Sequence, residues 1–264
     1  MKKFKNIAII VLSVMAIIAE LGLAEASRRD VKFADLKVNI DTSEGNYFVD
    51  NLDIESQVFA HGYQTGIESV LNIDKRKLEA QFESMPSVKK AEVYTTLNGV
   101  LFVDVTQRTP LVRIFTKRGS FYLDKEGYVM PLSNSYTAKV PVANGEINVG
   151  YDDVAGLNFA NSLEDTKENQ EFNKLYESYT LCKKFKEVDF WNAQFKQIYF
   201  LEDGDIELIP AVGNHVILID GVENLDESLT KLMILYKEGL SKTGWNNYEV
   251  INLKYKDQIV GIKR

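Results

Sequence analysis

Residues 87–115, SVKKAEVYTTLNGVLFVDVTQRTPLVRIF, decide much of the fold. Two runs within this stretch, 88–96 and 100–106, alternate apolar and polar residues in the manner of strands with one buried face. They are joined around Asn98-Gly99, a dipeptide that accepts the positive φ values of a type I′ turn. The stretch therefore predicts a β-hairpin, and a further extended segment follows it without a linker.

The residues before this hairpin predict one strand and two helices. Residues 36–40 (LKVNI) alternate, as expected of a strand. Asp50 is placed to cap a first helix that ends near Gly62, and Asp74 begins a second helix that ends at Pro86. The predicted order is strand, helix, helix, strand, strand, which gives a compact unit of roughly 75 residues with helices on one face of a three-stranded sheet.

The residues after the hairpin predict a larger second domain, so the expected fold class is α+β with a mixed β-sheet domain and packed helices. Extended runs separated by turn residues are expected at 112–115, 120–123, 128–132, 194–201, 206–209, 215–220, 248–254 and 258–263. Apolar residues recur at helical spacing over 172–185 and 225–240, and Gly244 is placed to end the second of these helices. Residues 151–168 form a polar insert to which we assign no role.

The N-terminal segment determines the compartment. Residues 1–6 are basic, and the 13-residue run 7–19 is apolar apart from Ser13, the pattern of a segment delivered to a membrane insertion machinery. The run is close to the length of a signal-peptide core, and Ala24-Glu25-Ala26 offers a cleavage site. Continued to residue 24, the segment is about 27 Å long as a helix, close to the ~30 Å of a hydrocarbon core. Both an anchor and a cleaved signal fit, and both export the chain from Ser27 onward.

Composition excludes several classes of function. The 264 residues with 45% apolar content are enough for more than one core, and the net charge of −7 argues against nucleic acid as the main partner. One cysteine, Cys182, and two histidines, His61 and His215, exclude an intrachain disulfide and a Cys/His zinc cluster.

Individual polar residues are best explained as structural. Cys182 lies on the apolar stripe of a helix and is expected to be buried, and His215 begins a strand and is expected to be half-buried. Asp203 and Asp205 flank a glycine between two strands and predict a turn rather than a metal site. Phosphate loops, nucleophile elbows and acid/base spacings are absent from the sequence, so we expect neither an enzyme nor a cofactor.

These segments carry a resemblance to a known family. The strand and helix order with its tail SVKKAEVYTTLNGVLFVDVTQRTPLVRI resembles a polypeptide-transport-associated (POTRA) domain, and residues 93–114 resemble the corresponding part of the bacterial cell-division family FtsQ. The runs DGDIELIPAVGNHVILIDG (203–221) and YEVINLKYKDQIVGIKR (248–264), with the helix between them, resemble the second half of the FtsQ β domain. Apart from the 151–168 insert, the match covers nearly the whole chain.

The resemblance implies a domain plan and a location. It implies a cytoplasmic tail (1–6), an uncleaved transmembrane anchor (7–24), a stem (25–35), a POTRA domain (36–108) and an FtsQ-type β domain (109–264). The protein would be a single-pass protein of the cytoplasmic (inner) membrane at the division septum, with its C-terminal part outside the cytoplasm.

The last strand is the predicted binding site. A final strand at a sheet edge leaves a row of N–H and C=O groups to which an extended partner segment can add, whereas Lys263 and Arg264 are also placed to discourage such pairing. In the FtsQ family this region captures the small single-span division protein FtsB, acting with FtsL, so the resemblance implies FtsB-like and FtsL-like partners here. The implied contact residues are Leu253, Tyr255, Ile259, Val260, Gly261, Ile262 and Lys263, with Gly261 letting a foreign backbone approach closely. Trp245 is predicted as a further contact because it can serve as an anchor.

Magnitudes limit what the edge achieves alone. About four ladder hydrogen bonds at ~1 kcal/mol net each give ~4 kcal/mol, which corresponds to a millimolar dissociation constant. Anchors such as Tyr255 and Trp245, and tethering of both partners in one membrane, would supply the rest.

Three functions remain as hypotheses. The resemblance implies a scaffold that links assembly of the division machinery to septal wall synthesis and holds further division proteins through its POTRA domain. A POTRA-bearing factor in outer-membrane protein assembly or secretion is an alternative, although no series of ~10-residue barrel strands follows the module. A secreted cell-wall enzyme is the third, weakened by the missing nucleophile and metal signatures.

Overall fold

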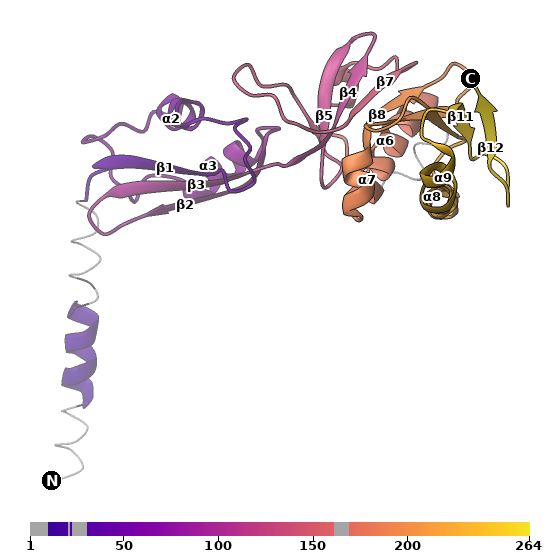
Figure 1. Cartoon of the computed structure of the whole chain (residues 1–264). Coiled ribbons are helices and arrows are strands. Elements are labelled where there is room, and N and C mark those ends of the chain that lie inside the picture. The colour runs from indigo at the N-terminus through magenta and orange to yellow at the C-terminus, as the bar shows by residue number, and fades with distance from the viewer. Residues whose placement is uncertain (1–9, 21, 23–30, 161–168) are drawn as a thin grey trace. The chain divides into compact units, whose positions relative to one another are not determined.

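The computed structural model describes residues 10–20, 22, 31–160 and 169–264 (Figure 1). The chain divides into two compact units, Met1–Gln107 and Arg108–Arg264. Residues 10–20 are helical. Within the described residues, no helix combines the length and the apolar character needed to span a membrane. The predicted anchor, 7–24, falls partly outside the described residues.

The first unit has the predicted order of two helices and three strands. Its sheet has the order β1-β3-β2, with β1 parallel and β2 antiparallel to β3. The elements are β1 (Asp35–Asp41), α2 (Asn51–Ala60), α3 (Lys75–Glu83), β2 (Val88–Thr95) and β3 (Val100–Gln107).

The two helices of this unit start at the predicted caps. The Asp50 carboxylate accepts from the Asp53 backbone N–H at 2.9 Å, and the Asp53 carboxylate accepts in return from the Asp50 N–H at 2.9 Å, which completes a capping box. Asp74 caps α3 by accepting from the Lys77 N–H at 3.0 Å. Each helix buries a pair of apolar residues four positions apart against the sheet, namely Ile54 and Val58 in α2 and Leu78 and Phe82 in α3.

The turn between β2 and β3 differs from the predicted type I′ turn. Gly99 has φ +87°, but Asn98 does not have a positive φ, which a type I′ turn requires at both central residues. Instead, Gly99 N–H donates to the Thr96 carbonyl at 3.2 Å and Thr96 N–H donates to the Val100 carbonyl at 2.9 Å. This is the three-residue loop in which a type I turn is followed by a left-handed glycine. A Cβ on Gly99 would lie 2.1 Å from the Lys32 carbonyl oxygen, so close approach of the preceding chain also requires glycine.

A buried glutamine side chain links three separate segments of the first unit. Gln107, only 5% exposed, accepts through Oε1 from the N–H groups of Phe48 at 2.8 Å and Val49 at 3.0 Å. Its Nε2 donates to the carbonyls of Asp41 at 3.1 Å and Asn46 at 2.9 Å. One side chain thus joins the ends of β1 and β3 to the loop before α2.

The second unit is built on a nine-stranded mixed sheet. Its order is β12-β11-β10-β9-β8-β7-β4-β5-β6, and the β4·β7, β7·β8 and β10·β11 pairs are parallel. The strands are β4 (Pro110–Thr116), β5 (Gly119–Asp124), β6 (Val129–Met130), β7 (Val142–Gly145), β8 (Phe195–Phe200), β9 (Ile206–Pro210), β10 (Val216–Ile219), β11 (Tyr248–Asn252) and β12 (Val260–Lys263). The helices are α4 (Tyr151–Val154), α6 (Gln170–Lys186), α7 (Asp189–Gln194), α8 (Leu225–Ile234), the π-helical η1 (Leu235–Leu240) and α9 (Ser241–Thr243). The predicted mixed sheet with packed helices is confirmed.

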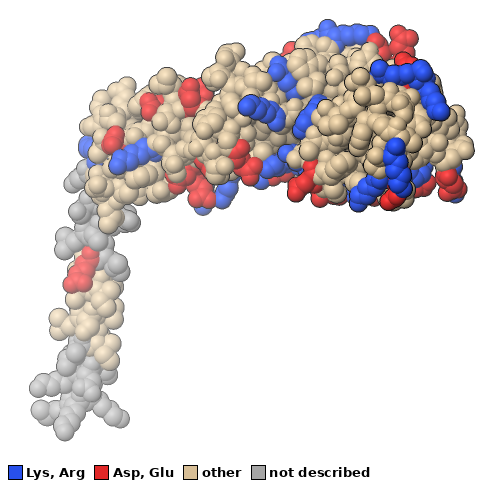
Figure 2. Space-filling model, viewed as in Figure 1, with Lys and Arg blue, Asp and Glu red and all other residues tan. Residues whose placement is uncertain are grey.

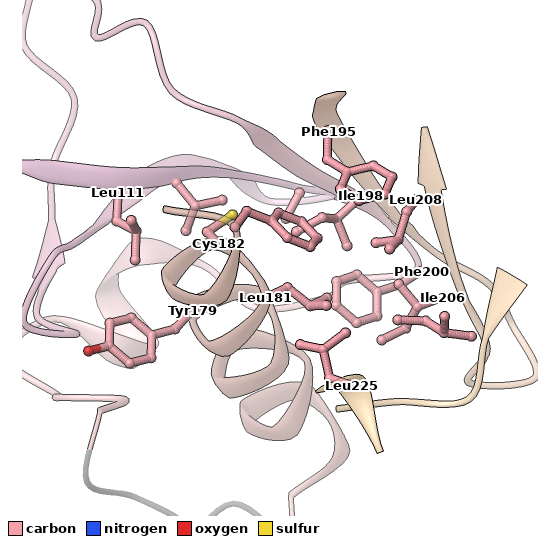
Figure 3. Close-up of a cluster of buried hydrophobic side chains, with 14 of the residues drawn as sticks. Leu111, Tyr179, Leu181, Cys182, Phe195, Ile198, Phe200, Ile206, Leu208 and Leu225 are labelled. Atoms are coloured by element: carbon pink, nitrogen blue, oxygen red, sulfur yellow. The ribbon is translucent and has the colours of Figure 1, made fainter. Parts of the chain in front are cut away.

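Helix α6 supplies the centre of the second core. Its side chains Leu181 and Cys182 point toward Phe195, Ile198 and Phe200 of β8 (Figure 3). Cys182 is 1% exposed, and burial raises the pKa of its thiol. The expected structural role of this cysteine is confirmed.

Some elements of the second unit depart from the prediction. Strand β7 and the short helices α4 and α7 carry no clear periodic signal and were not predicted. The helix expected over 225–240 is α-helical only to Ile234 and continues as a π-helix, although Gly244, with φ +97°, ends it as expected.

Candidate partner-binding edge

The chain covers one end of the nine-stranded sheet with its own backbone and leaves the other end unpaired. At the β6 end, Val129 N–H donates to the Leu157 carbonyl at 3.3 Å, and Tyr128 forms a β-bridge with Asn158. At the other end, all four residues of β12 are exposed. No segment of the described chain pairs with the outer side of β12, which lies beyond β11 in Figure 1. The predicted last strand is therefore an open edge.

The register shows which groups of β12 point outward. Arg264 N–H donates to the Asn247 carbonyl at 3.4 Å, so Arg264 faces β11. Because bonding direction alternates along an antiparallel strand, Ile262 and Val260 also bond toward β11. Gly261 and Lys263 then direct their N–H and C=O groups to the open side. The edge offers two donors and two acceptors.

Apolar side chains accompany these backbone groups. Val260 and Ile262 lie two residues apart on one face of β12 and are 39% and 52% exposed. Tyr255, in the connection between β11 and β12, is 49% exposed. The Lys231 ammonium donates to the Tyr255 carbonyl at 3.0 Å, which ties this connection to α8.

Gly261 has a role that the sequence did not reveal. A Cβ at this position would lie 2.6 Å from two ring carbons of Tyr248, Cδ1 and Cε1. The Tyr248 ring of β11 therefore lies across Gly261 and fills the space that a side chain would take. The ring covers a face of the strand and not its edge, so it leaves the outward N–H and C=O of Gly261 accessible.

Three of the predicted contact residues support the edge from inside. Leu253 is 2% exposed and its N–H donates to the Leu218 carbonyl at 2.9 Å, so its side chain belongs to the core and is not available to a partner. Ile259 is half-buried and packs on the same core. Trp245 is also half-buried, with its ring 4.8 Å from that of Tyr236.

An aromatic cluster holds the segment that leads into β11. His215 is 2% exposed, so the expectation of a half-buried histidine was wrong; its ring lies 6.3 Å from that of Trp245, and Nε2 lies 3.0 Å from the Tyr236 hydroxyl. Burial lowers the pKa of His215, opposed by the Trp245 backbone. Burial also raises the pKa of Tyr236 to about 12, opposed by Gln194. The cluster favours a neutral imidazole and phenol.

The Asp-Gly-Asp segment between β8 and β9 forms the predicted turn. Asp203 accepts from the Asp205 N–H at 3.1 Å, and Asp205 pairs with the Lys254 ammonium at 2.5 Å. This pair joins the turn to the residues after β11. In the described residues, no group of three or more His, Cys, Asp and Glu side chains is arranged to hold a metal ion.

A polar cleft of about 990 Å³ lies between α6, the β8–β9 turn and the β10–α8 connection. Among its lining residues, Glu177 is partly buried, and this burial raises the pKa of its carboxyl to about 7. Nothing in the local sequence distinguishes Glu177 from other helical glutamates. The residues that line the cleft include neither a histidine nor a cysteine that would complete a catalytic pair with Glu177.

Charge on the surface is mixed. On the face seen in Figure 2, Lys and Arg side chains and Asp and Glu side chains are both spread over a surface that is mostly of other residues.

Two family models match the chain. The model described as FtsQ/DivIB, C-terminal related, matches residues 109–262, which is more than half of the 264 residues. A model described as a POTRA-like domain matches residues 33–106. A search of curated proteins found no match. The resemblance inferred from the sequence is therefore confirmed, and the 151–168 insert lies within the first matched range.

Proposed function

The chain belongs to the FtsQ/DivIB C-terminal related family, and from this membership we propose that it is a membrane-anchored scaffold of the cell-division machinery. Strand β12 would take up an extended segment of a small single-span division protein. The observation that carries this proposal is the contrast between the two sheet ends, because the chain covers β6 with its own backbone and leaves β12 open.

The open edge of β12 supports weak binding of a partner segment, and tethering of both proteins in one membrane would make that binding sufficient. The outward groups of Gly261 and Lys263 supply about four ladder hydrogen bonds, worth ~4 kcal/mol net and a millimolar dissociation constant. Val260, Ile262 and Tyr255 add apolar contacts beside the ladder. Confinement of both partners to one membrane raises the effective concentration and supplies the remaining affinity.

The proposal includes the partners, the location and the mode of action. FtsB-like and FtsL-like proteins would bind β12, and the POTRA-like unit would bind other division proteins. Residues 7–24 would be the single anchor in the inner membrane, between a cytoplasmic tail (1–6) and a stem (25–35), with domains 36–108 and 109–264 outside the cytoplasm. The protein would act at the septum by binding rather than by catalysis, and would link assembly to wall synthesis.

Photo-crosslinking in living cells tests this proposal. A photoreactive amino acid at Tyr255, Ile262 or Lys263 is expected to trap a small single-span protein. Leu132 is the matched control, since it is 44% exposed but lies two residues after β6 at the covered end of the sheet. Absence of a product at all three edge positions, or an equal yield at Leu132, would contradict the proposal.

A pair of substitutions at Lys263 separates backbone pairing from side-chain contact. Lys263→Pro removes one outward N–H, worth ~1 kcal/mol, while leaving the bonds to β11 in place, so binding is expected to weaken about fivefold. Lys263→Ala retains the N–H and is expected to bind nearly as well as the wild type. Equal binding by both variants would show that the ladder does not carry the interaction.

A further inference from the structure

Strand β2 lies at one edge of the sheet of the first unit, and two of its outward amides are occupied. Val93 N–H donates to Glu79 Oε1 at 2.9 Å, and Ala91 N–H donates to Glu83 Oε1 at 3.3 Å. Thr96 N–H points the other way, to the Val100 carbonyl, so odd-numbered residues face outward here. These two N–H groups are among the donors that an added strand would use.

Helix α3 is suited to deliver both carboxylates. Glu79 and Glu83 are four residues apart on one face, separated by about 6 Å along the helix axis. Ala91 and Val93 are two residues apart on an extended strand, about 6.6 Å. Leu78 and Phe82, which neighbour the two glutamates in sequence, are fully buried and fix α3 against the sheet. The spacing of helix and strand thus matches two acceptors to two donors.

We propose that Glu79 and Glu83 form an intramolecular cap that closes the β2 edge to strand addition, and that the strand it excludes is β2 of a second copy of this chain. A carboxylate accepts a stronger hydrogen bond than a peptide carbonyl, so an incoming strand cannot displace the cap without loss. This inference does not depend on the function proposed above.

Charge complementarity favours a second copy as the excluded strand. If two β2 strands pair antiparallel with Ala91 opposite Ala91, Lys90 of each copy lies directly opposite Glu92 of the other. Both side chains are exposed, and within one chain they form an ion pair. Their exchange between two copies would preserve both ion pairs while completing the ladder.

The open β12 edge provides the contrast within the same chain. Among the described residues, no side chain accepts from the outward N–H groups of Gly261 or Lys263. The sequence therefore closes one exposed edge with carboxylates and leaves another without them.

The double variant Glu79→Ala/Glu83→Ala tests the cap. The full-length chain is studied in mild detergent, because residues 7–19 are almost wholly apolar. At low protein concentration, amide hydrogen exchange at Ala91 and Val93 is expected to become about ten- to hundredfold faster, the factor for losing a hydrogen bond to a charged group. Exchange at Lys90 and Glu92, which face β3, should not change. At high concentration, sedimentation is expected to show a dimer that the wild type does not form.

Three further variants serve as controls. Glu79→Gln/Glu83→Gln keeps an oxygen acceptor at each position and is expected to remain monomeric. Glu55→Ala removes a carboxylate from α2 and should leave exchange at β2 unchanged. Adding Lys90→Glu to the alanine variant places like charges opposite Glu92 and should reverse dimerisation.

Two outcomes would overturn the proposal. Unchanged exchange at Ala91 and Val93 in the alanine variant would show that the carboxylates do not protect these amides. A variant that exchanges faster but stays monomeric at the highest concentration reached would show that the cap does not exclude a second copy. Far-UV circular dichroism of each variant verifies that α3 and the sheet remain folded.

Discussion

Replacement of Gln107 by alanine is expected to destabilise the first unit by about 4 kcal/mol. The side chain makes four hydrogen bonds to backbone groups, between 2.8 and 3.1 Å long, and is 5% exposed. At ~1 kcal/mol net per bond the loss is ~4 kcal/mol, and incomplete access of water to the freed backbone groups would increase it.

Gln107→Glu distinguishes the donor half of this side chain from the acceptor half. The substitution keeps the volume and Oε1 but places a carboxylate oxygen against the carbonyls of Asp41 and Asn46. Two hydrogen bonds become repulsive contacts, so at pH 7 we expect a loss at least as large as that of Gln107→Ala. Acidification should recover part of it, because the protonated carboxyl donates one hydrogen bond.

The assay separates the two units of the chain. Both tryptophans, Trp191 and Trp245, lie in the second unit, so fluorescence during urea unfolding reports that unit alone. Amide exchange of β1 and β3 reports the first unit. We expect the exchange free energy to fall while the fluorescence transition stays in place. A loss below ~1 kcal/mol for Gln107→Ala, or wild-type stability of Gln107→Glu at pH 7, would refute the assigned hydrogen bonds.

Three shorter predictions concern the same two units. Gly99→Ala is expected to destabilise the first unit by about 2–3 kcal/mol, because it combines a positive φ with a Cβ clash against the Lys32 carbonyl; amide exchange of β2 and β3 measures it. Glu177→Gln removes a carboxylate whose charge is disfavoured by burial, so it is expected to raise the free energy of unfolding of the second unit by about 1–2 kcal/mol at pH 8. This value is reduced for screening of the charge by solvent in the cleft. No gain is expected at pH 4, where the carboxyl is protonated in both states. The folded-state pKa of about 7 lies above the ordinary 4.5, so the wild type loses stability as pH rises between these values. The pKa of His215 is lowered in the folded chain, so the unfolded chain binds a proton first as pH falls below the ordinary pKa of 6.5. The free energy of unfolding of the wild type therefore falls below pH 6.5 and is unaffected by this group above it. His215→Phe should remove this loss. The two pH effects oppose each other, so each is measured as the difference in tryptophan-fluorescence midpoint between wild type and variant.

The first unit was largely predictable because its signals are local. Asp50 and Asp74 mark helix starts, the alternation of β2 and β3 marks strands, and Gly99 marks the turn between them. The predicted type of this turn was wrong. The Asn98-Gly99 dipeptide indicates a positive φ at the glycine, but it does not determine the length of the loop. Loop length depends on pairing, here on the bonds between Thr96, Gly99 and Val100.

Several features of the second unit depend on contacts that local sequence does not encode. Strand β7 is four residues long, and it is a strand because it pairs in parallel with both β4 and β8. A Cβ on Gly145, at its end, would lie 2.3 Å from the Phe200 carbonyl oxygen, so this glycine permits a close approach rather than breaking the strand. The burial of His215 likewise arises from Tyr236 and Trp245, which follow it by more than 20 residues.

The functional residues of the two edges were hidden for the same reason. Glu79 and Glu83 are ordinary surface glutamates in the sequence of a helix, and their role becomes visible only when β2 is placed beside them. The open side of β12 was expected from the resemblance to the FtsQ family, in which this region takes up a partner. The division of that strand into inward and outward residues required the register with β11.

The charged C-terminus offers an alternative explanation for the open edge, since lysine and arginine on an edge strand discourage pairing. The structure weakens it for Arg264, whose guanidinium donates to the Asn214 carbonyl at 2.5 Å and is thereby held toward the β9–β10 connection. Of these two residues, Lys263 remains placed to discourage strand pairing, and it lies beside the exposed apolar side chains of Val260 and Ile262. The same chain closes β6 with backbone and β2 with carboxylates. A sequence that covers the other end of the same sheet with its own backbone and leaves one lysine on β12 favours a binding edge there over a guarded one.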